Sequence, residues 1–216
     1  MKYDAIIFDL DGTLLNTLED LANSTNFALT SMGYPQRTIE EIRSFVGNGI
    51  EKLIRRALPA YCNEDDFQKA LALFKSHYAS HCEDNTKPYE GILNLLETLA
   101  VRGVCLAVVS NKIDSAVKIL CSRFFENLIP IAIGAQEGIS KKPSPDMIFS
   151  ALKQLNISLD RTVYVGDSEV DILTAQKAGM DMICVTWGFR DQAFLQENGA
   201  KIFANSPQDL KNLLLL

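Results

Sequence analysis

The sequence predicts an α/β protein: a Rossmann-like parallel sheet core with an inserted α-helical cap domain. Two observations lead to this prediction. Short apolar runs alternate with helix-length stretches over most of the 216 residues, a pattern typical of a parallel sheet with helices on both faces. After the first apolar run, about 70 residues of helical pattern interrupt the alternation, which is too long for a plain connection between a strand and a helix.

The predicted strands are apolar runs too short for amphipathic helices, and the first of them, residues 5–8, ends at Asp9. The other strands are expected at 104–109, 128–133, 162–165 and 182–185, with a weak one at 201–203. Helices are expected between them at 91–102, 113–124, 145–155 and 168–178, and a last helix after Ser206. Ligands of such a sheet bind at the carboxyl ends of its strands.

The interrupting segment, 16–87, shows no convincing strand and begins its helices with cap signals. Thr17 with Asp20, and Thr38 with Glu41, have the spacing of a capping box, in which two side chains satisfy free amides at a helix start. Helices are expected at 17–32, 38–45, 49–58 and 64–82. We therefore expect residues 1–15 and 88–216 to form the catalytic core and 16–87 to form a helical cap.

The charge balance excludes several kinds of partner. The chain has 21 Lys and Arg against 27 Asp and Glu, a formal net charge of −6. It lacks the basic surplus by which proteins bind nucleic acid or anionic membranes. The acidic residues near the start leave no room for a secretory signal, and no run approaches the length of a membrane span. We expect a cytoplasmic protein.

Two carboxylates follow the first predicted strand, in the sequence Asp9-Leu10-Asp11-Gly12-Thr13. Alternate side chains of an extended chain point the same way, so Asp9 and Asp11 face one side, and Gly12 lets backbone amides approach a ligand. Such a pair can hold a divalent cation or divide into a nucleophile and a proton donor. A surface turn is the plainer explanation of this motif taken alone.

Polar residues also follow three later strands. They are Ser110 and Asn111 after 104–109, Lys141 and Lys142 after 128–133, and Asp167 and Asp171 after 162–165. Each group alone is typical of a helix cap or of solvated charge. Because the carboxyl ends of parallel strands meet at one edge of a sheet, their joint order predicts one common site.

Taken in order, the D-x-D-G-T motif, the Ser-Asn pair, the Lys-Pro pair and the G-D-x-x-x-D motif resemble those of the haloacid dehalogenase (HAD) superfamily hydrolases. The resemblance covers essentially the whole chain, since the helical insertion is similar to the smaller cap of that superfamily. Within it, the segments 45–50 and 88–91 are most similar to phosphoglycolate phosphatases. Gly47, Asn48 and Gly49 are therefore expected to form a substrate loop of the cap.

The resemblance implies a role for each motif residue. Asp9 would attack phosphorus and form an aspartyl-phosphate, while Asp11 would protonate the leaving oxygen and then deprotonate the attacking water. The implied ligands of Mg²⁺ are Asp9, the backbone carbonyl of Asp11, and Asp167. Thr13 would fix the geometry of the phosphate-binding set, whose other members are Ser110, Asn111 and Lys142.

Two features depart from the superfamily's pattern. Many members have Asn directly before the second acid of the last motif, whereas this chain has Val170, so a hydrogen bond would be missing or supplied by Ser168. Asp171 would orient Lys142 or a water on the metal. Lys142 is preferred over Lys141 as the phosphate ligand because the superfamily's lysine adjoins the proline. The carboxylates of Asp9, Asp11, Asp167 and Asp171 carry four negative charges when all are ionised, and Mg²⁺ and Lys142 supply three positive ones. The net charge of the site is therefore zero only if Asp11 is protonated.

Other residues have plainer explanations. His77 and His81 stand four apart on a predicted helix but lack a third metal ligand at a recognisable spacing. Trp187-Gly188-Phe189, after the 182–185 strand, is expected to pack. The basic side chains of Lys52, Arg55 and Arg56 could steer an anionic substrate or lie on a solvated helix face.

The expected function is that of a Mg²⁺-dependent phosphomonoester hydrolase acting on a small phosphorylated, anionic metabolite, with phosphoglycolate as the best guess. Alternatives are a β-phosphoglucomutase-like or phosphonatase-like reaction, the latter with Lys52 forming a Schiff base. A further alternative is a non-catalytic phosphate-sensing module similar to receiver domains, which lack the helical insertion. No nucleic-acid or membrane partner is expected, and the sequence does not decide between a monomer and a dimer.

Overall fold

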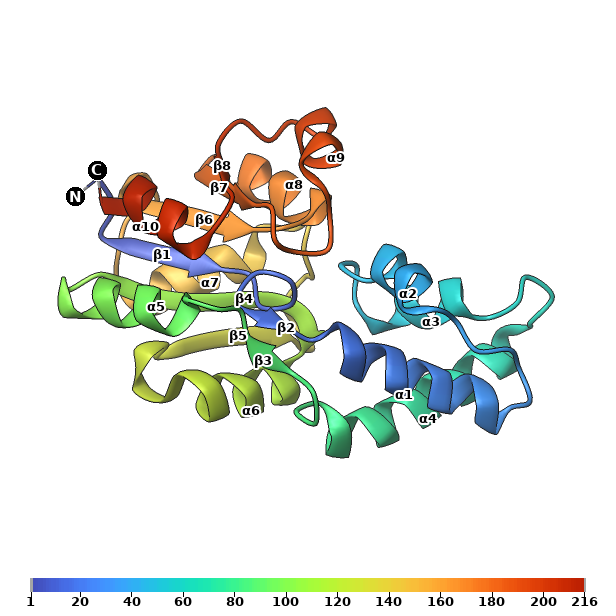
Figure 1. Ribbon diagram of the computed structural model, residues 1–216. Helices are drawn as coiled ribbons and strands as arrows, with labels where there is room; N and C mark the ends of the chain where they lie inside the picture. Colours follow the sequence, from blue (N-terminus) through green and yellow to red (C-terminus); the bar gives the residue numbers. More distant parts are fainter. Residues whose placement is uncertain (1, 216) are drawn as a thin grey trace. The chain divides into compact units, whose positions relative to one another are not determined.

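The computed structural model describes residues 2–215, and the chain folds into two compact units (Figure 1). One unit comprises the chain up to Leu15 and from Pro88 onward, and the other comprises Asn16–Lys87. The two-residue strands β2 (Leu15–Asn16) and β3 (Lys87–Pro88) pair with each other where the chain passes between the units. The α/β class predicted from the sequence is confirmed.

The first unit is built on a six-stranded parallel sheet with the order β5-β4-β1-β6-β7-β8. Its strands are β1 (Ala5–Phe8), β4 (Cys105–Ile113), β5 (Ile131–Ala135), β6 (Thr162–Gly166), β7 (Asp181–Val185) and β8 (Phe203–Ala204). All four residues of β1 are buried, as expected of a central strand covered on both faces. The strand order reverses at β1, so a crevice between strand ends is expected there.

Helices cover both faces of this sheet (Figure 1). The helices are α5 (Ile92–Val101), α6 (Asp114–Phe125), α7 (Asp146–Leu155), α8 (Glu169–Ala178), α9 (Gln192–Glu197) and α10 (Pro207–Leu215), with 3₁₀ turns η1 (Glu126–Leu128) and η2 (Leu159–Arg161). α5, α6 and α10 lie on one face, and α7 and α8 lie on the other. Between α7 and the sheet, Met147 and Ile148 pack with Ile7 in the core, which fixes where the strand ends lie.

Three boundaries differ from those expected. β4 continues through Ser110 and Asn111 to Ile113, with an irregular register against β5 between Val109 and Ile113. β5 begins at Ile131, three residues later than expected, because Leu128 belongs to η1 and the next two residues lie outside the strand. The last strand, β8, lies at Phe203–Ala204. An irregular strand end re-aims its side chains, and such irregularities are common beside active sites.

The second unit consists of four helices, α1 (Leu18–Ser31), α2 (Ile39–Phe45), α3 (Ile50–Ala57) and α4 (Glu64–His81). The capping box of Thr38 and Glu41 at α2 is confirmed. The one predicted at Thr17 is wrong, because Thr17 makes no side-chain cap bond. Its intended partner, the Asp20 carboxylate, instead accepts hydrogen bonds from Asn85 and Thr86.

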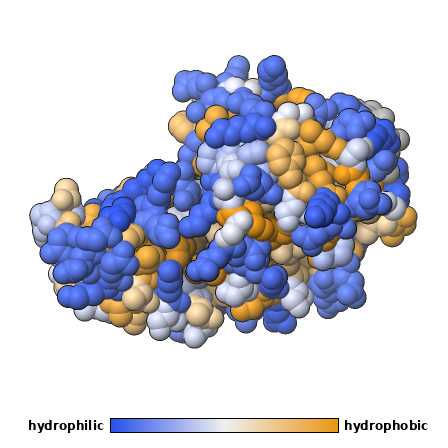
Figure 2. All heavy atoms as spheres, turned by 180° about the vertical axis from the view of Figure 1, so that it is seen from behind, coloured by the Kyte–Doolittle hydropathy of each residue, from blue (hydrophilic) through white to orange (hydrophobic). Residues whose placement is uncertain are grey.

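The surface is mostly hydrophilic on the face drawn in Figure 2, with apolar atoms gathered in patches. Among the large apolar side chains that are exposed, Phe149 belongs to α7 and Leu173 to α8. None of the helices in residues 2–215 has both the length and the apolar character needed to cross a membrane.

Candidate active site

The strand ends of β1 and β6 place two aspartates side by side. Asp9 directly follows β1, and its amide donates to the carbonyl of Val165 in β6 at 2.8 Å. Asp167 directly follows β6. Beyond Asp9 the chain turns back on itself, and the carbonyl of Leu10 accepts the amides of Leu14 and Leu15, both at 3.0 Å. The sheet and this turn therefore hold the backbone of the first motif rigidly against β6.

Gly12 makes this turn possible for two reasons. Its φ is 86°, in the left-handed region, which side chains other than that of glycine rarely tolerate. A Cβ atom at this position would also collide with the carboxylate of Asp167. The glycine of the D-x-D-G-T motif thus brings the turn into contact with the second strand end.

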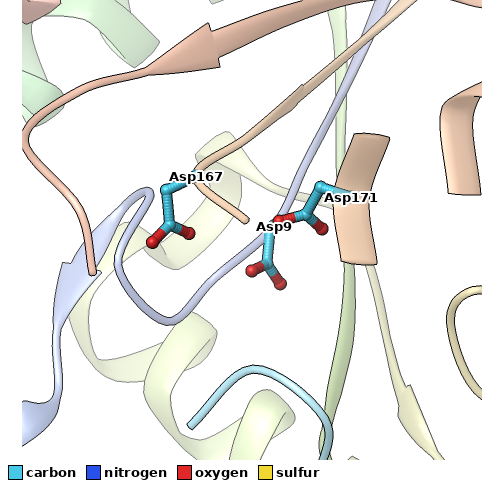
Figure 3. A group of neighbouring side chains, drawn as sticks. All are labelled: Asp9, Asp167 and Asp171. Atoms are coloured by element: carbon cyan, nitrogen blue, oxygen red, sulfur yellow. The ribbon is translucent and has the colours of Figure 1, made fainter. Parts of the chain in front are cut away.

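Three buried carboxylates cluster at these strand ends (Figure 3). Oxygen atoms of Asp9, Asp167 and Asp171 lie within 4.8 Å of one another. In the view of Figure 3, Asp9 lies between the other two. Within residues 2–215 no other group of three or more His, Cys, Asp or Glu side chains comes together in this way, and His77 instead stacks on His81 at 4.2 Å.

Lys142 supplies the cation between two of these carboxylates. Its Nζ donates to Asp9 Oδ1 at 2.7 Å and to Asp171 Oδ1 at 2.8 Å, and also to the Tyr164 hydroxyl at 3.0 Å. The lysine side chain is 2% exposed. Lys141 is exposed, so the structure places the lysine beside the proline, and not its neighbour, against Asp9.

Both carboxylate oxygens of Asp171 accept hydrogen bonds from the protein. Oδ1 accepts from Lys142 and from the Tyr164 hydroxyl, and Oδ2 accepts from the amide and the hydroxyl of Ser168. Ser168 and Asp171 also form a capping box at the start of α8. Ser168 therefore supplies two hydrogen bonds to Asp171, while Val170 is buried. With both oxygens occupied, Asp171 orients Lys142 and offers no lone pair toward a metal ion.

Asp167 is held by neutral donors at both oxygens. The Thr13 hydroxyl donates to Oδ1 at 3.0 Å, and the backbone amide of Phe189 donates to Oδ2 at 2.7 Å. Asp9 is held less completely: in the part of the chain that the structure describes, its Oδ2 has no hydrogen-bond partner. Asp9 thus presents an oxygen that is free to react or to bind an ion.

Burial is the main influence on the pKa values of this cluster, and the nearby charges add to it or oppose it. Burial raises the pKa of Asp9 to about 7, although the Lys142 ammonium acts in the opposite direction. Burial also raises the pKa of Asp167 well above its usual range, and the nearby carboxylates of Asp171 and Asp9 raise it further. Burial alone would lower the pKa of Lys142, but Asp171 and Asp9 raise it well above its usual value. The lysine is therefore a permanent cation.

Lys112 is a site residue that the sequence analysis missed. Its Nζ donates to both carboxylate oxygens of Asp11, at 2.8 and 3.1 Å, and its side chain is 2% exposed. It lies in the irregular end of β4, and its place directly after the Ser-Asn pair is the one sequence signal for it. Lys112 adds a second buried positive charge to the site beside that of Lys142.

The other predicted residues occupy different places. Ser110 and Asn111 are buried beside Lys112 in β4. The Asn111 side-chain amide donates to the backbone carbonyl of Lys142 at 3.0 Å, which holds the lysine segment in place. Gly47, Asn48 and Gly49 lie between α2 and α3 in the helical unit, and their role as a substrate loop stays a prediction.

The basic side chains of α3 are engaged within the helical unit. Arg55 donates to both carboxylate oxygens of Glu64 at 2.9 and 3.0 Å and lies over the Phe67 ring. Arg56 donates to the carbonyl of Phe45 at 2.7 Å, and Lys52 donates to the Asn48 side chain at 3.3 Å. Arg55 is thus paired with an opposite charge, whereas the bonds of Arg56 and Lys52 go to neutral groups and leave their charges in place. Their role in steering a substrate stays a prediction.

Comparisons with known proteins indicate the family of the chain. Residues 6–185 match the family model described as haloacid dehalogenase-like hydrolase. Phosphoglycolate phosphatase 1 of Pseudomonas aeruginosa is 32% identical over 216 residues, which are 95% of this chain and 77% of that protein. Phosphoglycolate phosphatase of Aliivibrio fischeri is 34% identical over 191 residues, which are 85% of this chain and 84% of that protein.

Solved structures agree over nearly the whole chain. A crystal structure from Lactobacillus delbrueckii subsp. bulgaricus, which carries phosphoglycolate phosphatase as a provisional name, has a TM-score of 0.94 at 37% identity and 99% coverage of both chains. A predicted phosphoglycolate phosphatase from Haemophilus somnus 129PT has a TM-score of 0.91 at 28% identity, again with 99% coverage of both chains. On the match to the family model and the identity to these relatives, the chain belongs to the haloacid dehalogenase-like hydrolases.

Proposed function

We propose that this protein is a Mg²⁺-dependent phosphomonoester hydrolase that acts on a small anionic metabolite through an aspartyl-phosphate, with phosphoglycolate as the leading substrate. One observation carries the proposal: Asp9 presents an uncommitted oxygen between the Lys142 ammonium and a second buried carboxylate, Asp167. The names of the relatives from Pseudomonas aeruginosa and Aliivibrio fischeri support the choice of substrate.

The residues of the cluster fit a hard divalent cation. Carboxylate oxygens are the donors that Mg²⁺ prefers, and buried carboxylates this close together are unfavourable without a cation. Asp9, Asp167 and the backbone carbonyl of Asp11 would hold the ion. When bound, it would place positive charge against the transferring phosphoryl group. Asp171 is excluded as a ligand because both of its oxygens accept hydrogen bonds from the protein.

The first chemical step transfers the phosphoryl group to Asp9. A carboxylate oxygen of Asp9 bonds to phosphorus, the ester P–O bond breaks, and the leaving oxygen takes a proton from Asp11. In the second step water attacks the same phosphorus and gives a proton to Asp11. The bond between Asp9 and phosphorus then breaks, which releases inorganic phosphate and restores both side chains.

The phosphoryl group needs a positively charged cradle, because its equatorial oxygens carry negative charge in the transition state. Lys142 would neutralise that charge from its position on Asp9. The Ser110 hydroxyl would donate to the same oxygens, as would the N–H of the Asn111 side-chain amide that does not bond to the Lys142 carbonyl. Thr13 keeps Asp167 in place and so acts through it. In the helical unit, the loop of Gly47, Asn48 and Gly49 is the proposed substrate loop.

Phosphate release tests the proposal. Wild-type protein with Mg²⁺ should liberate phosphate from a panel of small phosphomonoesters, with the highest kcat/KM on phosphoglycolate. Asp9→Asn should lower turnover by at least about 10³-fold, because no other side chain can replace the nucleophile. EDTA should abolish the activity and added Mg²⁺ should restore it. Equal turnover by wild type and Asp9→Asn would refute the assignment of the nucleophile.

A further inference from the structure

The loop after β7 contacts both chain segments that carry the candidate metal site, the turn after β1 and the residue after β6. We call residues Trp187, Gly188 and Phe189 the β7 loop. The indole Nε1 of Trp187 donates to the backbone carbonyl of Thr13 at 3.0 Å, and the amide of Phe189 donates to Asp167 Oδ2 at 2.7 Å. The same short loop therefore forms hydrogen bonds both to the turn after β1 and to the carboxylate of Asp167 after β6.

Gly188 makes this close approach possible. A Cβ atom at this position would collide with Asp167 and with the carbonyl oxygen of Gly12. Both obstacles are buried or part of the backbone, so neither can move aside cheaply. The glycine is needed because the β7 loop packs directly on the residues that carry the site.

Trp187 acts on Asp167 through one intermediate residue. Thr13 is fully buried, and its hydroxyl donates to Asp167 Oδ1 at 3.0 Å. Because Trp187 holds the backbone of Thr13, the indole N–H fixes the donor that orients one carboxylate oxygen, while Phe189 orients the other. Side chains and amides that orient a ligating carboxylate commonly set the affinity for the metal.

We propose that Trp187 is a positioning residue of the metal site and that its indole N–H sets the affinity for the divalent cation through Thr13 and Asp167. This inference rests on the proposed function, because it takes Asp167 to be a metal ligand. It assigns a role in metal binding to a segment whose sequence suggests packing alone.

The packing of Trp187 can be separated from its hydrogen bond. The residue is half-buried and lines a cavity of about 520 Å³ together with Tyr89 and Pro207. Its ring meets the Tyr89 ring edge to face, with centroids 6.5 Å apart. Trp187→Phe keeps an aromatic ring there but removes the N–H donor. Tyr89→Leu is the matched control, because it removes the aromatic partner and leaves the bond to Thr13.

Mn²⁺ binding without substrate tests the inference independently of turnover. Mn²⁺ has the same preference for carboxylate oxygens as Mg²⁺, and free Mn²⁺ is counted directly by electron paramagnetic resonance. Trp187→Phe should raise the dissociation constant for Mn²⁺ about 10-fold, whereas Tyr89→Leu should match the wild type. Turnover by Trp187→Phe at saturating Mg²⁺ should recover most of the wild-type kcat, with an unchanged KM for the phosphomonoester.

Each outcome decides the matter. If Trp187→Phe binds Mn²⁺ as tightly as the wild type, the inference is overturned, even if its melting temperature has fallen. If Tyr89→Leu weakens binding equally, packing and not the N–H sets the affinity, which also overturns it. A wild-type protein that binds no Mn²⁺ at millimolar concentrations overturns the proposed metal site and this inference together. The tryptophan fluorescence of the wild-type protein gives a second measure of Mn²⁺ binding, since Trp187 is the sole tryptophan of the sequence.

Discussion

Two buried aspartates, one in each unit, have very different surroundings. Asp20 in α1 is 1% exposed, and its carboxylate accepts five hydrogen bonds of 2.7–3.1 Å from Asn85 and Thr86. All of these donors are neutral. Asp9 is 7% exposed, shares its surroundings with two further carboxylates, and accepts a hydrogen bond from the Lys142 ammonium.

The difference separates a structural carboxylate from the one that we propose as the nucleophile. The donors around Asp20 replace the water that its carboxylate lost on folding. The carboxylate therefore joins the segment after α4 to α1 with little loss of folding free energy. Around Asp9 the protein supplies too few donors and too much like charge, an arrangement that lowers stability and is typical of functional sites. Burial alone therefore does not distinguish the two aspartates, whereas the number of donors and the nearby like charge do.

Removing the cation should have the largest effect on the Asp9 cluster. Lys142→Met leaves Asp9 and Asp171 facing each other without a positive charge, and breaking such a buried pair typically costs about 3 kcal/mol of unfolding free energy. Turnover should fall by about 10³-fold, since the phosphoryl charge loses its main protein partner. Urea unfolding and phosphate release measure the two effects.

Lys141→Met is the control for this substitution. Lys141 is the exposed neighbour in the same segment, so its loss should leave stability and turnover close to those of the wild type. Comparable losses in both variants would show that the segment, and not the ammonium on Asp9, is what matters.

Much of this arrangement could be predicted from the sequence, because it depends on local pattern. Uniform apolar runs predicted β1 and β6, and their end positions predicted that Asp9 and Asp167 lie close together. The resemblance to the superfamily, whose lysine adjoins a proline, favoured Lys142 over Lys141. Each of these signals lies within a few residues of the feature it predicts.

Other features could not be predicted because they depend on distant parts of the chain. Asp20 has the spacing of a cap partner for Thr17, but donors about 65 positions later in the chain compete for it and win. Lys112 lies in a strand end whose direction is set by an irregular register with β5. The contact of Trp187 with Thr13 joins residues 174 positions apart, and no local pattern indicates it.

Neutral substitutions at the two aspartates sharpen the comparison. Asp20→Asn replaces one accepting oxygen with an amide that faces other donors, so the free energy of unfolding should fall by about 2 kcal/mol. Asp9→Asn removes one of three crowded negative charges, so without metal the protein should be at least as stable as the wild type. Urea unfolding of both variants in EDTA measures the difference.

Turnover should change in the opposite sense. Folded Asp20→Asn should keep its activity, whereas Asp9→Asn should lose it. If Asp9→Asn proves to be the less stable of the two, the cluster is a structural ion network and the distinction drawn above fails.

The smallest effect is expected at a third kind of carboxylate, the exposed Asp4. Arg161 donates to both of its oxygens at 2.7 and 3.0 Å, and these bonds lower the pKa of Asp4 below its usual value. The stabilisation is therefore present above the unfolded-state pKa of about 4 and disappears as pH falls through the lower pKa of the folded state. Arg161→Gln should accordingly lower the melting temperature at pH 7 and leave it unchanged near pH 2.

Sensitivity to salt distinguishes the exposed Asp4–Arg161 pair from the buried carboxylate of Asp20. Both partners of the Asp4 pair are exposed, so 1 M NaCl should screen their attraction and remove most of the difference between Arg161→Gln and the wild type. The loss of stability in Asp20→Asn should persist in the same salt, because neutral donors inside the protein are not screened. Equal salt sensitivity of the two losses would mean that charge, and not the number of hydrogen bonds accepted, governs how this protein stabilises its carboxylates outside the site.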